Sequence, residues 1–204
     1  MIPELSDKNA NIKQLSEKAL ENEGLLIELL SGLKSKEETF RYNCSRILLL
    51  ISETHGEVLY PEWDYFVELL NSEHTYWKMS ALRIIANLVR LDKENKFDKI
   101  FDRYYSILDE EKTSLAAHIA VNSGKIAKAK PALQTRVTER LLNIDKTHSG
   151  KQKDLIKGYA IEAFSEYFEE VTNKDKILEF IKNQQNSKSP KTRKLAEEFL
   201  KKWS

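Results

Sequence analysis

The side chains that could hold a metal ion or attack a substrate are few in this chain and poorly spaced for either task. The four histidines are His55, His74, His118 and His148, and no two of them are four residues apart, the spacing that places two metal ligands on one face of a helix. The sequence also contains no glycine-rich phosphate loop and none of the motifs HExxH, CxxC and GxSxG. We therefore expect no enzymatic activity, no bound metal and no cofactor.

Cys44 is the one cysteine, so it cannot form a disulfide within the chain. Disulfides are rare in reducing compartments, and this cysteine usage favours such a compartment. The first residues lack a basic stretch followed by an apolar run, and the longest apolar run, 47–51, is too short to cross a bilayer. These observations predict a cytoplasmic protein that does not enter a membrane.

A repeat in the sequence predicts the elements that carry the remaining side chains. A small residue followed by an apolar cluster recurs at intervals of 37, 39, 40 and 36 residues, at Cys44, Ala81, Ala120, Ala160 and Ala196. Apolar residues follow three, four and seven positions later, which places them on one stripe of a helix. Because each interval holds two helices and a turn, the pattern predicts an all-α protein built of helical hairpins.

A second set of helices is predicted between these, because further apolar stripes alternate with turn residues. Pro61, Pro131 and Pro190 fall where helices should begin, and proline is tolerated in the first turn of a helix. The hairpin around Ala120 has Ser123 and Gly124 where most hairpins have large apolar residues. Small side chains at these positions predict a close helix crossing.

The composition agrees with a helical repeat. With 204 residues and 41% hydrophobic content the chain can bury a continuous core, while 32% charged residues supply solvated outer faces. Six glycines and four prolines leave little room for long loops.

The repeat resembles the HEAT/armadillo class of helical repeat proteins. A basic residue stands three positions before the small residue in four hairpins: Arg41, Lys78, Lys157 and Arg193. The third hairpin departs from this pattern with Ala117. The resemblance implies a right-handed α-solenoid of about five HEAT-like hairpins. It also implies a single repeat domain over residues 1–204, with an N-terminal capping helix in 1–23 and repeats in 24–204. Such solenoids serve many unrelated tasks, so the class implies no single function.

The candidate binding residues come from the wheel positions opposite the buried stripe, which in solenoids of this class tend to line the concave surface. With the neighbouring Tyr76, the set is Tyr42, Arg46, Tyr76, Met79, Arg83, His118, Asn122 and Glu162. Tyrosine, arginine and methionine are favoured at protein interfaces. The stripe predicts a non-enzymatic protein-binding scaffold or adaptor for a protein or peptide partner with an acidic segment. An ordinary solvated face with scattered apolar side chains stays open as the other interpretation.

The charge distribution supports an alternative function, nucleic-acid binding. Residues 1–109 carry 14 basic and 19 acidic side chains, whereas residues 110–204 carry 19 and 13. HEAT-like solenoids include alkylpurine DNA glycosylases, which hold duplex DNA in a basic concave channel. The corresponding candidate patch here is Lys146, Lys151, Lys153 and Lys157. We rank it below protein binding, because this stretch lacks interleaved aromatic residues and the chain has a net charge of only +1.

Overall fold

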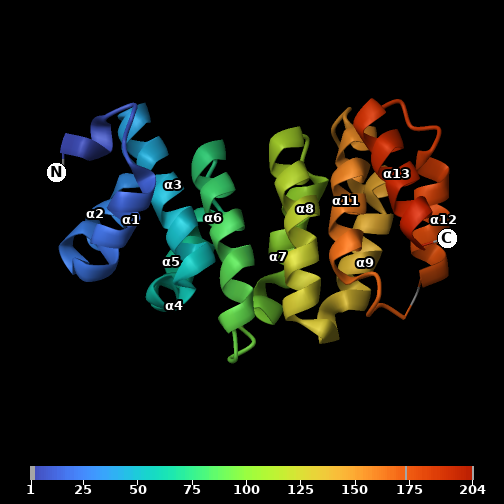
Figure 1. Cartoon of the computed structure of the whole chain (residues 1–204), viewed down its shortest axis with the longest axis horizontal. Coiled ribbons are helices and arrows are strands. Elements are labelled where there is room, and N and C mark those ends of the chain that lie inside the picture. The colour runs from blue at the N-terminus through green and yellow to red at the C-terminus, as the bar shows by residue number, and fades with distance from the viewer. Residues whose placement is uncertain (1–2, 173, 204) are drawn as a thin grey trace. The chain divides into compact units, whose positions relative to one another are not determined.

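The computed structural model describes residues 3–172 and 174–203, and within these ranges the chain forms helices and no strand (Figure 1). This confirms the predicted all-α class. The chain divides into two compact units, Met1–Leu91 and Asp92–Ser204, which we call the N-terminal and C-terminal units and describe separately. Within the described ranges no helix is long and apolar enough to cross a membrane. The predicted single repeat domain over 1–204 stays a prediction.

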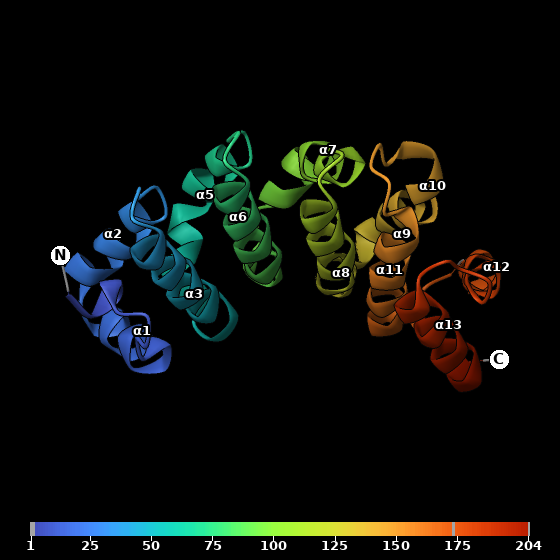
Figure 2. The same ribbon diagram turned by 90° about the horizontal axis from the view of Figure 1, so that it is seen from above.

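The N-terminal unit consists of two layers of helices. Figure 2 shows α1, α3 and α6 in one layer and α2 and α5 in the other. The elements are η1 (Pro3–Ser6), α1 (Ile12–Glu21), α2 (Glu23–Gly32), α3 (Glu38–Thr54), α4 (Gly56–Leu59), η2 (Tyr60–Glu62), α5 (Trp63–Leu69), α6 (Thr75–Leu88) and η3 (Val89–Leu91). The segment predicted as a capping helix contains α1, which packs against α2 and α3.

The C-terminal unit repeats this two-layer arrangement. Figure 2 shows α8, α11 and α13 in one layer, with α7, α10 and α12 in the other. The elements are α7 (Lys96–Asp109), α8 (Thr113–Ala129), η4 (Pro131–Leu133), α9 (Gln134–Leu142), α10 (Ile144–Thr147), α11 (Lys153–Tyr167), α12 (Lys174–Gln184) and α13 (Pro190–Trp203). The prolines at 61, 131 and 190 lie in the first turns of η2, η4 and α13, as predicted.

The core of each unit is built on the predicted stripe. The five small residues that define the repeat have no exposed surface: Cys44, Ala81, Ala120, Ala160 and Ala196. The apolar residues three, four and seven positions later are also buried on α3, α6 and α11. Burial of such a stripe is the main source of stability for an amphipathic helix. The periodicity therefore identified the buried face of these helices correctly.

The hairpin around Ala120 contains the close crossing that its small residues predict. At Gly124 of α8, a Cβ atom would lie 2.9 Å from the backbone oxygen of Ala163 in α11 and 2.7 Å from Cδ of Glu166. Glycine is therefore required where α8 meets α11. The preceding Ser123 accepts a hydrogen bond of 3.0 Å from the hydroxyl of Tyr105 in α7.

Polar side chains fix α3 against α6 in the N-terminal unit. The hydroxyl oxygens of Ser45 and Ser80 are 2.7 Å apart, and the amide of Asn87 donates to the hydroxyl of Ser52 at 2.9 Å. Both pairs join residues that are 35 positions apart, close to the repeat interval. Ser80 also donates to the carbonyl of Tyr76, so Ser45 is the donor in the first pair. These bonds hold the two helices in a fixed register.

A hydrogen bond of the same kind also joins helices outside the α3–α6 and α8–α11 layers, once within each unit. In the N-terminal unit the Tyr65 hydroxyl of α5 donates to the carbonyl of Leu30 in α2 at 2.7 Å. In the C-terminal unit Nη2 of Arg140 in α9 donates to the carbonyl of Tyr105 in α7, also at 2.7 Å. Each pair is again separated by 35 positions. Successive hairpins within a unit are thus linked through equivalent helices.

Candidate functional site

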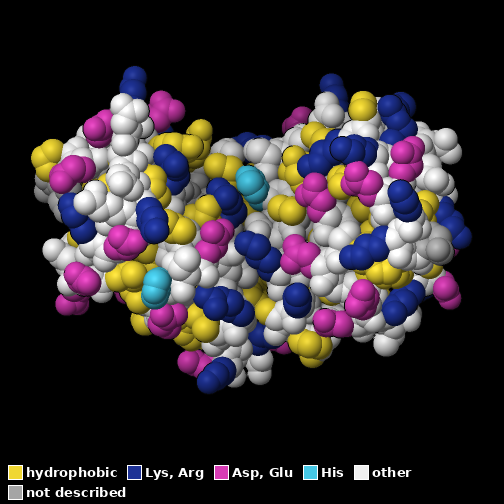
Figure 3. All heavy atoms as spheres, viewed as in Figure 1, with side chains coloured by type: hydrophobic (Ala, Val, Ile, Leu, Met, Phe, Trp, Pro, Cys, Tyr) yellow, Lys and Arg dark blue, Asp and Glu magenta, His cyan; other side chains and the backbone are white. Residues whose placement is uncertain are grey.

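A cavity of about 370 Å³ opens on the layer of the N-terminal unit that contains α1, α3 and α6. Five of the sequence-predicted residues line it: Tyr42, Arg46, Tyr76, Met79 and Arg83. We call it the α3–α6 cavity. Figure 3 shows hydrophobic and basic side chains intermixed over these helices. The repeat positions that were grouped from the sequence therefore do meet in space within this unit.

Two exposed tyrosines form the rim of the cavity. Tyr42 is 51% exposed and Tyr76 is 43% exposed; within the described ranges, the other large hydrophobic side chain with comparable exposure is Ile27. The guanidinium carbon of Arg46 lies 5.5 Å from the centre of the Tyr42 ring, and that of Arg41 lies 5.7 Å from the centre of the Tyr76 ring. Both distances are within the range of cation–π attraction. Each tyrosine thus presents its ring together with a positive charge.

Arg83 supplies a second guanidinium and is partly desolvated. Burial lowers the pKa of Arg83 below its ordinary value, while the negative charge of Glu53 acts to raise it. Arginine stays protonated in proteins, so the site holds a fixed positive charge with incomplete hydration. A guanidinium in this state gains more from a carboxylate partner than a fully hydrated one does. Arg83 can therefore bind an anionic group of a partner.

Apolar side chains form the remaining wall of the α3–α6 cavity. Leu49 and Leu50 come from α3, Met79 from α6 and Ile12 from α1. The Ser45 hydroxyl, which is hydrogen-bonded across to α6, also lines the cavity. Glu53 also lines the cavity, so it combines an apolar surface with two arginines and one carboxylate. The excess positive charge beside an apolar wall suits one apolar side chain next to one acidic group.

A second cavity, of about 420 Å³, shares the same two tyrosines and is lined by an earlier part of α3. It is lined by Tyr42 and Tyr76 together with Lys8, Glu38 and Arg41, and we call it the Arg41 cavity. The guanidinium of Arg41 is held in place, because its Nη1 donates to the carbonyl of Ser35 at 2.7 Å. The tyrosine pair is thus shared by two basic cavities.

Sequence reasoning missed several residues of these cavities. Arg41 was noted as part of the repeat pattern but was not assigned to the binding set, although it precedes Tyr42. Glu53 is three turns along α3 from Tyr42, beyond the offsets used for the set. Lys8 and Ile12 precede the first repeat, so the period gave no means of placing them. The signal for Arg41 was present in the sequence, whereas the contribution of 3–21 needed the structure.

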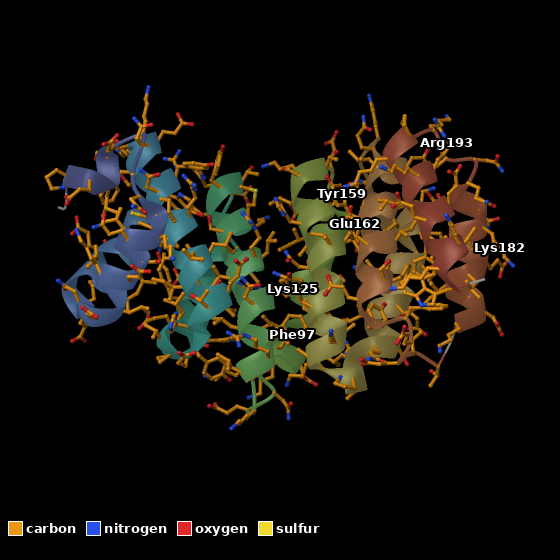
Figure 4. The ribbon with its side chains drawn as sticks, in the orientation of Figure 1. Phe97, Lys125, Tyr159, Glu162, Lys182 and Arg193 are labelled. Atoms are coloured by element: carbon orange, nitrogen blue, oxygen red, sulfur yellow. The ribbon has the colours of Figure 1, made fainter. Side chains whose placement is uncertain are left out.

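The other predicted binding residues belong to the C-terminal unit and are differently placed. The expectation that Asn122 lies on an exposed face is wrong, because it is 7% exposed and α8 is enclosed by its closely packed neighbours. His118 is half-buried on the same helix. Glu162 of α11 pairs with Lys191 of α13, with their charged atoms 3.0 Å apart. Figure 4 shows Glu162 and Tyr159 one turn apart on α11, and the Lys191 ammonium lies 3.6 Å from the centre of the Tyr159 ring.

The structure also corrects the assignment of residues to the candidate nucleic-acid patch. Lys146 and Lys151 are exposed, but Lys157 is buried, which corrects its assignment as a free phosphate contact. Its ammonium lies 2.9 Å from Oδ1 of Asp154 and 3.1 Å from Oδ2 of Asp145. Although burial acts to lower the pKa of Lys157, the hydrogen bonds to these carboxylates raise it.

Lys153, the remaining member of the patch, has a partner within the unit as well. Its ammonium donates to the carbonyl of Asp145 at 2.7 Å. The four lysines therefore do not form a uniform free basic surface.

The thiol of Cys44 is not placed for chemistry. It has no exposed surface, and burial, assisted by the charge of Glu28, raises the pKa of Cys44 to about 12. The reactive thiolate is therefore scarce at neutral pH. Within the described ranges no group of three His, Cys, Asp or Glu side chains is arranged to hold a metal ion.

Comparison with known proteins supports the fold and no function. No protein-family model matches this chain, and no curated protein matches it. Among solved structures, the chain is similar to a crystal structure described as that of an engineered protein. The similarity has a TM-score of 0.52 at 17% sequence identity and covers 96% of this chain and 90% of that chain. At this identity the likeness shows the fold alone.

Proposed function

We propose that the chain is a non-enzymatic scaffold that binds a protein or peptide partner in the α3–α6 cavity. Its hairpins would be HEAT-like repeats of a right-handed α-solenoid. The hydrogen bonds between residues 35 positions apart support the repeat, because they recur in both units. The observation that carries the binding proposal is the exposed tyrosine pair at the rim of the cavity, with an arginine over each ring.

The binding energy would come from two kinds of contact. Covering Tyr42, Tyr76 and Met79 removes apolar surface from water, which is favourable by about 25 cal/mol per Å². Arg46 and Arg83 would bind carboxylates of the partner, and charge-assisted hydrogen bonds are stronger than neutral ones. Tyrosine and arginine are also the residue types that most often dominate interface energetics. The partner is thus expected to carry an acidic segment next to apolar residues.

The test is capture of partners from a cell lysate, with and without nuclease treatment, by the wild-type chain and by an Arg46→Glu, Arg83→Gln double variant. Glutamine is used at 83 because a carboxylate there would face Glu53. The matched control is Lys36→Glu with Lys93→Gln, which changes the net charge equally at two exposed lysines outside both cavities. Circular dichroism melting curves establish that each variant is folded.

The proposal predicts that a protein retained by the wild type and by the control is lost from the double variant. Equal retention by all three chains would contradict the cavity assignment. Retention that disappears on nuclease treatment would instead favour the nucleic-acid alternative and would direct attention to Lys146 and Lys151.

A further inference from the structure

The charge of the two cavities differs from that of the unit around them. Residues 1–91 carry 10 basic and 14 acidic side chains, so this part of the chain is acidic. The α3–α6 cavity nevertheless has Arg46 and Arg83 against Glu53. The Arg41 cavity has the same balance, two cations and one carboxylate. Each cavity is therefore a positive spot on an acidic background, which favours an anionic group at each of two places.

The two cavities differ in the apolar surface that lies beside their positive charges. Leu49, Leu50 and Met79 give the α3–α6 cavity an apolar wall. The Arg41 cavity lacks such a wall: besides the two tyrosines its lining is polar or charged, with Lys8, Glu38, Thr39, Arg41 and Asn43. The first cavity suits an apolar side chain together with a carboxylate, whereas the second suits a carboxylate alone.

Tyr42 and Tyr76 line both cavities, and along α3 the Arg41 cavity is lined by 38–43 and the α3–α6 cavity by 42–53, so Tyr42 lies where the two linings meet. A single short side chain cannot occupy both places, so the two anionic groups must come from different residues of one segment. The Asn43 amide is already committed, donating to the carbonyls of Leu5 and Asp7 at 3.0 and 2.8 Å. Arg41 and Lys8 are the two cations of the second cavity, so they are the side chains that can bind a carboxylate there by charge.

We infer that the partner segment is a peptide with an acidic residue on each side of an apolar residue, and this inference rests on the proposed function. The apolar residue and one carboxylate bind in the α3–α6 cavity, where Arg46 and Arg83 receive the charge. The peptide passes over Tyr42 and Tyr76. The second carboxylate binds Arg41 and Lys8.

The experiment selects peptides from a random phage-displayed library on the immobilised full chain, with a Tyr42→Ala, Tyr76→Ala double variant used for subtraction. The expected consensus has acidic residues on both sides of an apolar one. A fluorescent synthetic peptide of that consensus is then titrated against the wild type, Arg83→Gln and Arg41→Gln by fluorescence anisotropy. Each variant is expected to bind about tenfold more weakly, the effect of losing one charge-assisted contact.

The decisive readout pairs each arginine with one acidic position of the peptide. Replacing one acidic residue by glutamine should no longer weaken binding in the Arg83→Gln chain, and replacing the other should no longer weaken it in Arg41→Gln. Because Arg41 also bonds to the carbonyl of Ser35, Lys8→Gln at an exposed side chain serves as a second variant for that cavity. Lys36→Gln, which lines neither cavity, is the control.

The outcomes separate the inference from the proposed function. A consensus with one acidic position, or a single position that pairs with both arginines, would overturn the two-anion inference and leave peptide binding in the α3–α6 cavity standing. If no peptide distinguishes the wild type from the tyrosine double variant, the proposed function fails together with the inference.

Discussion

The two units place side chains of the same repeat position in different surroundings. Two residues after the small repeat residue, the N-terminal unit has the exposed Arg46 and the half-buried Arg83. The C-terminal unit has the buried Asn122 and Glu162, which pairs with Lys191. The period fixes where a residue lies on its helix, but the neighbouring helices decide whether it meets solvent, a cavity or an ion pair. The two exposed tyrosines with an arginine over each ring therefore belong to the N-terminal unit, whereas ion pairs between neighbouring helices are characteristic of the C-terminal unit.

The largest expected effect concerns the close crossing of the C-terminal unit. Gly124→Leu should destabilise the protein by about 3 kcal/mol, because the new side chain meets the backbone of α11 with no room to relax. Urea unfolding followed by circular dichroism measures this loss. Ser114→Leu adds the same side chain at an exposed position of α8 and should change stability by less than about 0.5 kcal/mol. Equal effects of the two substitutions would show that the crossing is not tight.

The second prediction concerns the exposed tyrosines. Tyr42→Ala with Tyr76→Ala should weaken binding of the partner by about 2 kcal/mol or more, as expected for interface hot spots, with little change in the melting temperature. Isothermal titration with the captured partner or selected peptide measures the affinity. The matched control is Tyr159→Ala in the C-terminal unit, whose ring contacts Lys191. A larger loss of affinity from the control than from the pair would place binding in the other unit.

A third prediction compares one cation from each unit. Lys157→Met should lower stability by about 1–2 kcal/mol, because it leaves two carboxylates without their buried partner. Arg46→Met should change stability by less than about 0.5 kcal/mol, since Arg46 is exposed, while it weakens partner binding. Denaturant unfolding and affinity measurements on both variants test the contrast. The reverse pattern would mean that Arg46 has a structural role and Lys157 a functional one.

The smallest expected effect is a dependence of stability on pH. The hydrogen bond from Lys157 lowers the pKa of Asp154 below its ordinary value. This carboxylate therefore stabilises the folded state above its unfolded pKa, and the contribution is lost as the pH falls through the folded pKa. Asp154→Asn should cost about 1 kcal/mol at pH 7, and the difference from the wild type should shrink below about pH 4. A difference that is constant with pH would show that the charge of Asp154 does not matter.

The predictable part of this structure is the part that is periodic. The five small residues of the stripe and the three helix-starting prolines could be placed from the sequence, because burial recurs with the repeat and proline is restricted to the first turn. The burial of Asn122 could not, because it depends on how closely α8 and its neighbours approach. Lys157 pairs with Asp154 three positions earlier on α11, a spacing that is visible in the sequence. Its pair with Asp145 could not be foreseen, because it depends on the turn that brings α10 beside α11.

The candidate site was predictable to a similar degree. Tyr42, Arg46, Met79 and Arg83 share repeat offsets on α3 and α6, so the sequence could group them before the structure showed them around one cavity. The wall supplied by Ile12 could not be foreseen, because α1 precedes the first repeat. The second cavity was missed for the same reason, since Lys8 completes it from outside the repeat.

The most direct test of the central claim is site-specific photocrosslinking. The photoreactive residue p-benzoylphenylalanine is placed at Met79, within the α3–α6 cavity, or at the exposed Ser165 of α11, and each chain is irradiated with the captured partner or selected peptide. If the partner binds in the α3–α6 cavity, a covalent adduct forms from position 79 and not from position 165. An adduct from position 165 alone, or equal adducts from both positions, would contradict the account.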